Sequence, residues 1–319
     1  MTKDAIHGLF QLLGWADHRA DQIHLVDDDD AILPTPFRIT ETAVAALSAV
    51  GLAISDIWKL RTGRQQTISL SAHQATASLR SGRYMLLDGK PVPTGRDAIT
   101  GIYPAKNDRW SYIHCNFPNH RDAALDVLGV PYEFESVKNA IKNWDALELE
   151  EALIAANGAG GMIRTLDEWS LHPQGKALDT LPLMEIIKIG DSEPEPLPKA
   201  DRPLSEVRVL DLTRVLAGPT CARTLAEHGA DVLKITASHL PHIGLQDYDT
   251  GHGKLSTFLD LRRKDDLDTL HKLVQNSDIF SQGYRPGTLD SRGLSPEELA
   301  ELRPGIIYVS LSAFGHTGP

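Results

Sequence analysis

The chain has 319 residues with 32 Lys and Arg against 43 Asp and Glu, and its formal charge of −11 predicts neither nucleic acid nor an anionic membrane as a partner. Hydrophobic residues make up 41% and charged residues 24%, which is typical of a globular protein, and this length usually divides into two domains. The two cysteines, Cys115 and Cys221, form no CxxC pair, so we expect buried core thiols, no disulfide framework and no structural zinc. No leader is evident at the N-terminus and no stretch approaches about 20 apolar residues, so the expected location is cytoplasmic.

The first half of the chain predicts a small, mixed α/β region. Apolar residues surround most of a helix over 41–63, which Gly63 ends, and the alternation in 65–71 predicts a strand followed by another helix. The acidic run 27–30 is interpreted as a solvated loop. Further along, a strand over 110–116 precedes three helices, near 118–128, 133–142 and 145–156.

Four prolines among charged residues in 191–203 exclude regular structure and predict a linker. We therefore divide the chain into a region 1–190, the linker 191–203 and a region 204–319. In the last region, short β-branched runs alternate with amphipathic segments. The expected strands are 207–212, 231–235, 255–261, 278–282 and 306–312, and the expected helices are 220–228, 265–275 and 295–302. Single helices between strands predict a doubly wound, Rossmann-like parallel sheet in an α/β protein.

Ligands of such sheets bind at the carboxyl ends of the strands, so we expect a site in the loops of this region. Residues 213–219 contain Gly218 and Pro219 at the start of a helix but lack the GxGxxG pattern of dinucleotide sites. Residues 250–254 offer a flexible backbone and one cation, and 283–287 offer a tyrosine beside an arginine. We expect all three loops near one edge of the sheet. Together they support a nucleotide-containing ligand and plain turns about equally.

The sequence carries no local pattern for a catalytic nucleophile or a metal. No GxSxG elbow occurs, and the N-terminal histidines His7, His18 and His24 lack HExxH spacing. Asp211 is the most tempting acid near the first loop, but alternation in the strand points it into the sheet packing. We therefore predict no catalytic residue and no metal ligand in this chain.

Three segments within about 205–319 follow one another in the chain: VRVLDLTRVLAGPTCARTLAEHGADVLKI, GHGKLSTFLDLRR and GYRPGTLDSRGLSPEELAELRPGIIYVSLSAFGHTGP. In this order they resemble family III CoA transferases, the CaiB/BaiF type that includes formyl-CoA and carnitine CoA transferases and α-methylacyl-CoA racemases. The first half resembles the later part of that family, on PFRITETAVAALSAVGLAISDIWKLRTGRQQTISLS, GIYPAKNDRWSYIHCNFPNH and GGMIRTLDEWSLHPQGKAL. The order of the halves is thus inverted relative to a usual member.

The resemblance implies a coenzyme A site. Val215, Leu216 and Ala217 match the loop that the family lays against the adenosine, and Lys254 matches the cation of its RGK motif. Gly283, Tyr284 and Arg285 match its N/G-F/Y-R element. The chain departs from the family pattern at three places, which are His252 in place of the RGK arginine, Thr236 and Ala237 where Glu-Arg is frequent, and Ser291 where a further arginine is common.

The resemblance further implies what the complete protein does. Family members transfer CoA between an acyl-CoA and a carboxylic acid through an aspartate that follows the TGP motif, and no residue of this chain occupies that position. The chain is accordingly expected to be a fragment, inactive alone, or a member without the usual nucleophile. The implied substrates are acyl-CoA and a carboxylic acid, with no bound cofactor, in a homodimer. Racemisation and a non-catalytic, CoA-binding or structural subunit are the alternatives, and the acyl group stays open.

Overall fold

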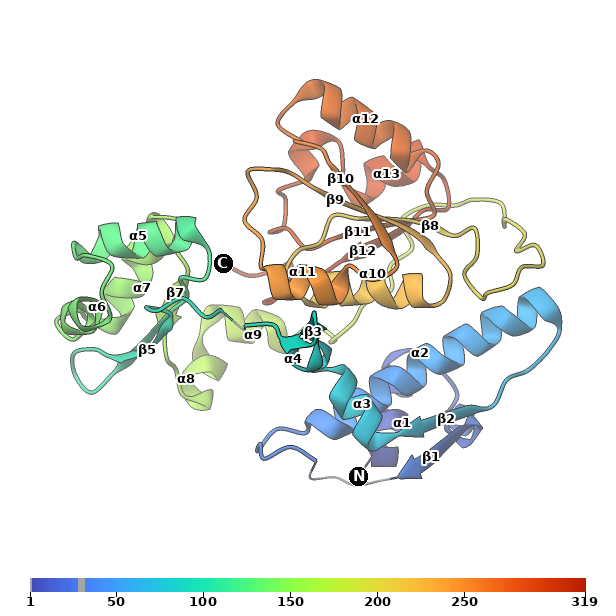
Figure 1. Cartoon of the computed structure of the whole chain (residues 1–319), viewed down its shortest axis with the longest axis horizontal. Helices are drawn as coiled ribbons and strands as arrows, with labels where there is room; N and C mark the ends of the chain where they lie inside the picture. Colours follow the sequence, from blue (N-terminus) through green and yellow to red (C-terminus); the bar gives the residue numbers. More distant parts are fainter. Residues whose placement is uncertain (1, 28–31, 94) are drawn as a thin grey trace. The chain divides into compact units, whose positions relative to one another are not determined.

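The computed structural model describes residues 2–27, 32–93 and 95–319, which divide into two compact units (Figure 1). Unit 1 comprises Met1–Val92 and Leu181–His316, and unit 2 comprises Pro93–Thr180 with Thr317–Pro319. The bounds of these units differ from those of the predicted segments 1–190, 191–203 and 204–319. Unit 1 combines the N-terminal segment with the parallel sheet, which lies beyond residues 93–180 in sequence. The division into family-derived segments stays a prediction.

Unit 1 contains a five-stranded sheet in the order β10-β9-β8-β11-β12, and every neighbouring pair is parallel. The strands are β8 (Arg208–Asp211), β9 (Asp231–Thr236), β10 (Lys254–Phe258), β11 (Ile279–Gln282) and β12 (Ile307–Ser310). The expected doubly wound α/β sheet is confirmed, with all five strands within two or three residues of their predicted bounds. Of these five strands, the first in sequence, β8, lies at the centre, so successive crossovers run outward from it in both directions.

Helices cover both faces of this sheet (Figure 1). They are α10 (Ala217–Glu227), α11 (Gly244–Thr250), α12 (Lys264–Val274) and α13 (Pro296–Leu302), with a 3-10 turn η2 (Asp290–Arg292) before α13. Leu270 and Val274 of α12 and Leu299 of α13 are buried in one core cluster with Phe280 of β11. Ala222 and Ala226 of α10 lie in a second core cluster. This cluster contains the strand residues that point to the other face of the sheet, including Val209 and Val232. All four residues of β11 are buried, as expected for a central strand covered on both faces.

The N-terminal part of unit 1 is built around a long helix, α2 (Ile39–Thr62), which confirms the predicted helix and ends at Gly63 with φ 74°. The other elements are α1 (Thr2–Leu12), η1 (Asp17–Gln22), β1 (Ile23–Asp27), β2 (Ile68–Ser71), α3 (Ala72–Ser78), α4 (Ser81–Tyr84), β3 (Leu86–Leu87) and β4 (Lys90–Pro91). The pair β1 and β2 is parallel. Asp27 is not in a solvated loop as expected: it ends β1, and its carboxylate accepts hydrogen bonds from the amides of Ala72 and His73. The rest of the acidic run lies outside the described residues.

By length and composition alone, α2 could cross a membrane, contrary to the expectation that no segment is apolar enough. The contacts of α2 within the protein give another explanation for its apolar composition. Val44 and Leu52 are fully buried in a cluster with α1 and α3, and Ile54 and Ile57 pack against the cluster that covers the parallel sheet. An apolar helix contacted on more than one side is typical of a protein core.

Arg61 joins α2 to the segment that leads into the sheet. Its side chain is 4% exposed and donates hydrogen bonds to the carbonyl oxygens of Pro198, Pro203 and Ser205 at 2.5, 2.6 and 2.7 Å. Residues 191–200 adopt neither helix nor strand, as the prolines predicted. The Arg61 guanidinium therefore stabilises a segment that has no helical or strand hydrogen bonds over residues 191–200.

Unit 2 is itself mixed α/β. Its antiparallel sheet has the order β5-β6-β7 and consists of β5 (Gly101–Pro104), β6 (Trp110–Ile113) and β7 (Gly160–Met162). Its helices are α5 (Pro118–Leu128), α6 (Phe134–Ile141), α7 (Ala146–Ala155), α8 (Leu166–Leu171) and α9 (Pro173–Asp179). The strand and the first three helices lie where the sequence predicts them, around a core that includes Tyr103, Ile113, Ile141 and Leu149.

Cys115 is 1% exposed in this core, as expected. Cys221, on α10 in unit 1, is only partly buried, which corrects its interpretation as a core residue. Desolvation raises the pKa of both thiols, that of Cys115 to about 12.

Candidate functional site

The candidate site lies at the carboxyl ends of β8 and β11, which are paired through Asp211 and Ser281. The amide of Leu212 continues this ladder by donating to the carbonyl of Ser281 at 2.8 Å. The crossover from β8 leads to β9 on one side, whereas the chain returns from β10 to β11 on the other side of β8. Loops that diverge in this way leave a crevice at the edge of a doubly wound sheet, and ligands of such folds bind there.

The first loop, residues 212–216, exposes apolar side chains under backbone strain. Val215 is 39% and Leu216 48% exposed, and Val215 has φ 73°, a conformation that a β-branched residue rarely adopts. Such conformations cost about 1–3 kcal/mol and concentrate in ligand-binding segments. Val215 and Leu216 therefore lie in the predicted loop and face solvent where a planar apolar group could contact them.

Ala217 is the first residue of α10, so the helix begins three residues before the predicted start at Thr220. Ala217 is exposed, and no side chain caps this helix end. The amides of the first turn therefore lie next to the exposed loop and favour an anionic group. Gly218 is required for close packing, because a Cβ there would lie 2.3 Å from the Cβ of Thr213.

The second loop follows β11. Gly283 and Arg285 are exposed, whereas Tyr284 is partly buried and packs against the core cluster of the sheet. The backbone amide of Tyr284 donates to the side-chain Oε1 of Gln282 at 2.7 Å. The side-chain Nε2 of Gln282 in turn donates to Oγ of Ser310 at 2.8 Å. The Tyr284 backbone thus stabilises the turn, and its ring is only partly accessible to a ligand. Arg285 is the exposed cation of this loop.

The two loops are neighbours. Burial raises the pKa of the Tyr284 phenol, and the positive charges of Arg214 and Arg292 oppose that rise. The charge of Arg214 in the first loop therefore acts on Tyr284 in the second loop. The sequence reasoning did not select Arg214, although its position one residue before Val215 was a signal that could have found it.

Lys254 is placed differently from the expectation that all three loops share one edge. It is the first residue of β10, in register with Val232, and so lies toward the amino ends of the strands. Its side chain is 2% exposed, and its ammonium donates to Oδ2 of Asp211 and to the carbonyl of Pro219, both at 2.8 Å. Burial lowers the pKa of Lys254, and the Asp211 carboxylate opposes that shift. The predicted phosphate cation is thus engaged inside the fold, and its role toward a ligand stays a prediction.

Asp211 is fully buried, as the strand alternation predicted. Besides the Lys254 ammonium, its carboxylate accepts hydrogen bonds from the amide and the hydroxyl of Thr213. A carboxylate enclosed in this way cannot meet a thioester carbonyl. His252, the residue in place of the family's arginine, has its Nδ1 2.9 Å from the Asp249 carbonyl oxygen, so this ring nitrogen is engaged within its own loop. Within the described residues, no group of three potential metal ligands occurs.

Comparison with known proteins finds a family model that matches the segment containing this site. Residues 204–319 match the family model of CoA-transferase family III. The matched segment contains β8 to β12 and both loops of the candidate site. Family III CoA transferases therefore supply the reference for this part of the chain, as the quoted motifs predicted.

Curated relatives extend the likeness. The chain is 29% identical over 248 residues to acetyl-coenzyme A transferase nodX of Hypoxylon pulicicidum, covering 70% of this chain and 42% of that protein. It is 26% identical over 339 residues to an acyl-CoA transferase of Gibberella moniliformis, covering 91% and 58%. Succinyl-CoA–D-citramalate CoA-transferase of Chloroflexus aurantiacus is 38% identical over 130 residues, covering 37% and 32%. The chain thus spans less than two thirds of the length of these relatives.

Solved structures were also matched. A CAIB/BAIF family protein from Brucella suis shares 31% identity with a TM-score of 0.33, covering 38% of this chain and 36% of that one. The protein Rv3272 from Mycobacterium tuberculosis shares 33% identity with a TM-score of 0.35, covering 37% and 34%.

The buried Lys254–Asp211 pair yields a stability prediction. Lys254→Met leaves an uncompensated buried carboxylate, so the free energy of unfolding should fall by about 3–5 kcal/mol in urea denaturation. Adding Asp211→Asn, which keeps an acceptor for the Thr213 amide, should recover a large part of that loss. Lys264→Met is the matched control, because the exposed pair of Lys264 with Asp268 should contribute at most about 1 kcal/mol. Equal losses for both lysine variants would contradict the structural role assigned to Lys254.

Proposed function

We propose that this chain is part of a family III CoA transferase and binds the coenzyme A moiety of an acyl-CoA at the carboxyl edge of β8 and β11. One observation carries the proposal: the strand order makes the junction of β8 and β11 the point where the crossovers diverge, and the segment that matches the family supplies both loops there. In the complete protein, CoA would pass from the acyl-CoA to a carboxylic acid.

Each part of the edge suits a portion of coenzyme A. The exposed apolar side chains of Val215 and Leu216 and the small Ala217 offer a flat contact for adenine. The uncapped start of α10 and the exposed Arg285 favour phosphate groups. Gly283 leaves space, since the nearest atom to a Cβ there would be 3.9 Å away. Lys254 would act indirectly, by holding Asp211 and the start of α10 in place.

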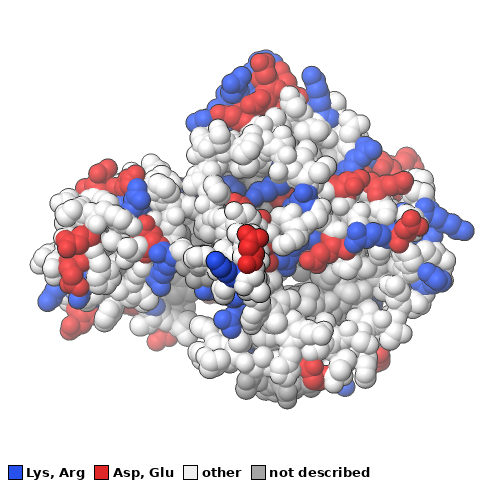
Figure 2. Space-filling view, in the orientation of Figure 1, with Lys and Arg blue, Asp and Glu red and all other residues white. Residues whose placement is uncertain are grey.

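The relatives' names favour CoA transfer over racemisation, because those reported above are CoA or acyl-CoA transferases. We also propose that the two halves stand in inverted order and that the Gibberella moniliformis protein shares this arrangement, because its alignment runs through 91% of this chain. We further propose a homodimer in the cytoplasm. Figure 2 shows acidic and basic side chains interspersed on the face in view, without a broad basic surface.

Binding of CoA should stabilise the chain against thermal unfolding. At a CoA concentration a hundred times Kd, mass action adds about 2.7 kcal/mol to the free energy of unfolding, seen as a higher Tm. Ala217→Leu should abolish the increase by filling the approach to the loop, and Ala155→Leu, at an exposed alanine of α7 in unit 2, should preserve it. An unchanged Tm of the unmodified chain at saturating CoA would remove coenzyme A as the ligand.

The chain alone should form no covalent CoA adduct. Transfer through a thioester intermediate needs a carboxylate that reaches the acyl carbonyl, and Asp211 is enclosed by Lys254 and Thr213. Incubation with acetyl-CoA followed by intact mass measurement should therefore show only the unmodified chain. A hydroxylamine-sensitive adduct mapped to any residue here would reveal a nucleophile within these 319 residues and refute this part of the account.

A further inference from the structure

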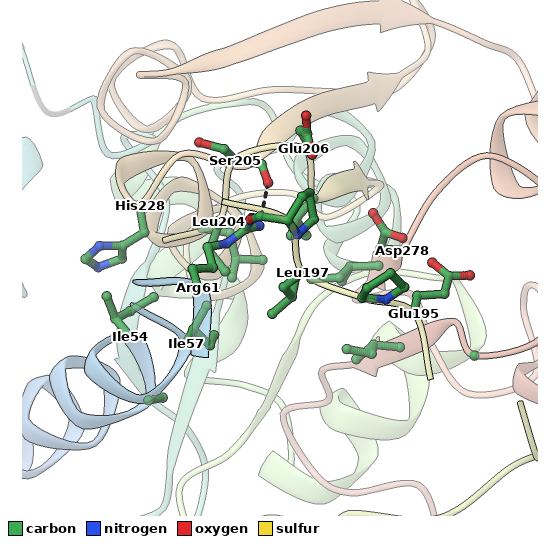
Figure 3. Close-up of a pocket in the computed structure, with 18 of the residues that line it drawn as sticks. Ile54, Ile57, Arg61, Glu195, Leu197, Leu204, Ser205, Glu206, His228 and Asp278 are labelled. Carbon is green, nitrogen blue, oxygen red and sulfur yellow. Dashed lines mark hydrogen bonds between the residues drawn. The ribbon is translucent and has the colours of Figure 1, made fainter. Parts of the chain in front are cut away.

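A second candidate site lies in unit 1, at the amino ends of strands of the parallel sheet. A cavity of 780 Å³ is bounded by α2, by the segment 192–198, by α10 and by the starts of β11 and β12. Figure 3 shows Ile54 and Ile57 of α2, with Leu197 and Leu204 from the segment before β8, around this space. Because the cavity borders the amino ends of the strands, it is separate from the candidate coenzyme A site at their carboxyl ends.

The cavity has the dimensions and the walls of a small-molecule site. Ligand pockets measure about 300–1,000 Å³ and are lined mainly by apolar side chains with a few polar groups. Here α2 contributes Ile54 and Ile57, and the opposite wall carries Leu197, Leu204 and Leu225. The wall is therefore a surface from which an apolar molecule would displace water at a gain in free energy.

The cations in the wall are already engaged. Arg61 donates to three backbone carbonyls, and Arg303 is paired with Glu195 at 2.6 Å and with Asp278 at 3.2 Å. Desolvation lowers the pKa of His228, so its ring is neutral at neutral pH. No basic group in the wall is left to receive an anionic head group.

The rim is acidic and locally strained. The exposed Glu206 lies beside Ser205 at the cavity with φ 70°, and Glu193 also lines the cavity. A non-glycine residue in this conformation costs of order 1–3 kcal/mol and often marks a ligand clamp. Carboxylates at the opening disfavour anions such as fatty acids or CoA phosphates.

We propose that this cavity binds an uncharged, predominantly apolar small molecule, independently of coenzyme A. The apolar wall supplies affinity, and the acidic rim with its engaged cations discriminates against anions. The site would therefore accept neutral aromatic or aliphatic compounds and reject carboxylates of similar size.

The probe for the test is N-phenyl-1-naphthylamine, a neutral dye whose fluorescence rises in apolar surroundings. The whole chain should bind it with saturation, and the anionic 8-anilinonaphthalene-1-sulfonate should bind about tenfold more weakly or not at all. Ala53→Phe, inside the cavity wall, should weaken dye binding about tenfold or more. Leu60→Phe is the matched control, because Leu60 lies on the same helix and is 76% exposed outside the lining.

Cys221 gives a readout that needs no filling variant, because it borders the cavity, whereas Cys115 is buried in unit 2. Saturating dye should slow alkylation of Cys221 by N-ethylmaleimide severalfold and leave the rate at Cys115 unchanged. The proposal is overturned by absence of saturable dye binding, by equal protection of both thiols, or by tighter binding of the anionic dye. Displacement of the dye by CoA would also overturn it, because the cavity would then belong to the coenzyme A site.

Discussion

The ion pair between Lys254 and Asp211 organises the functional part of unit 1. The two side chains come from β10 and β8, which lie on either side of β9, and the ammonium also reaches the carbonyl of Pro219 at the start of α10. Removing both charges from water is costly, so the pair is tolerated only because the remaining acceptor positions are filled, with Thr213 completing the coordination of Asp211. One interaction thus fixes a strand at the sheet edge, the central strand and the turn between β8 and α10.

The same ion pair connects two properties of the candidate site, the strained backbone at Val215 and the burial of Asp211. The loop after β8 can hold Val215 in a strained conformation because both of its ends are anchored, by Asp211 on one side and by the contact of Gly218 with Thr213 on the other. The same enclosure removes Asp211 from catalysis. Under the proposed function, this loop would hold coenzyme A while the chemistry occurs on other residues. Binding energy from a remote part of the substrate would then be used for positioning.

Local patterns were sufficient to predict the sheet, because β-branched runs and amphipathic segments depend on neighbours in sequence. The helix end at Gly63 and the burial of Asp211 followed from the same reasoning. Side-chain partners from distant segments could not be predicted. Nothing in the spacing shows that Lys254 turns toward Asp211, or that Arg61 bonds to carbonyls 137 to 144 positions away. The compact units also depend on such non-local contacts, which a proline-rich segment does not reveal.

Amide hydrogen exchange with and without CoA locates the ligand without any substitution. Coenzyme A bound at the carboxyl ends of β8 and β11 should slow exchange in two stretches, the turn 213–218 and the loop 283–288. Exchange in 192–207, which borders the apolar cavity, should not change. Protection in 192–207, with none in 213–218, would contradict the assignment of coenzyme A to the carboxyl edge of β8 and β11.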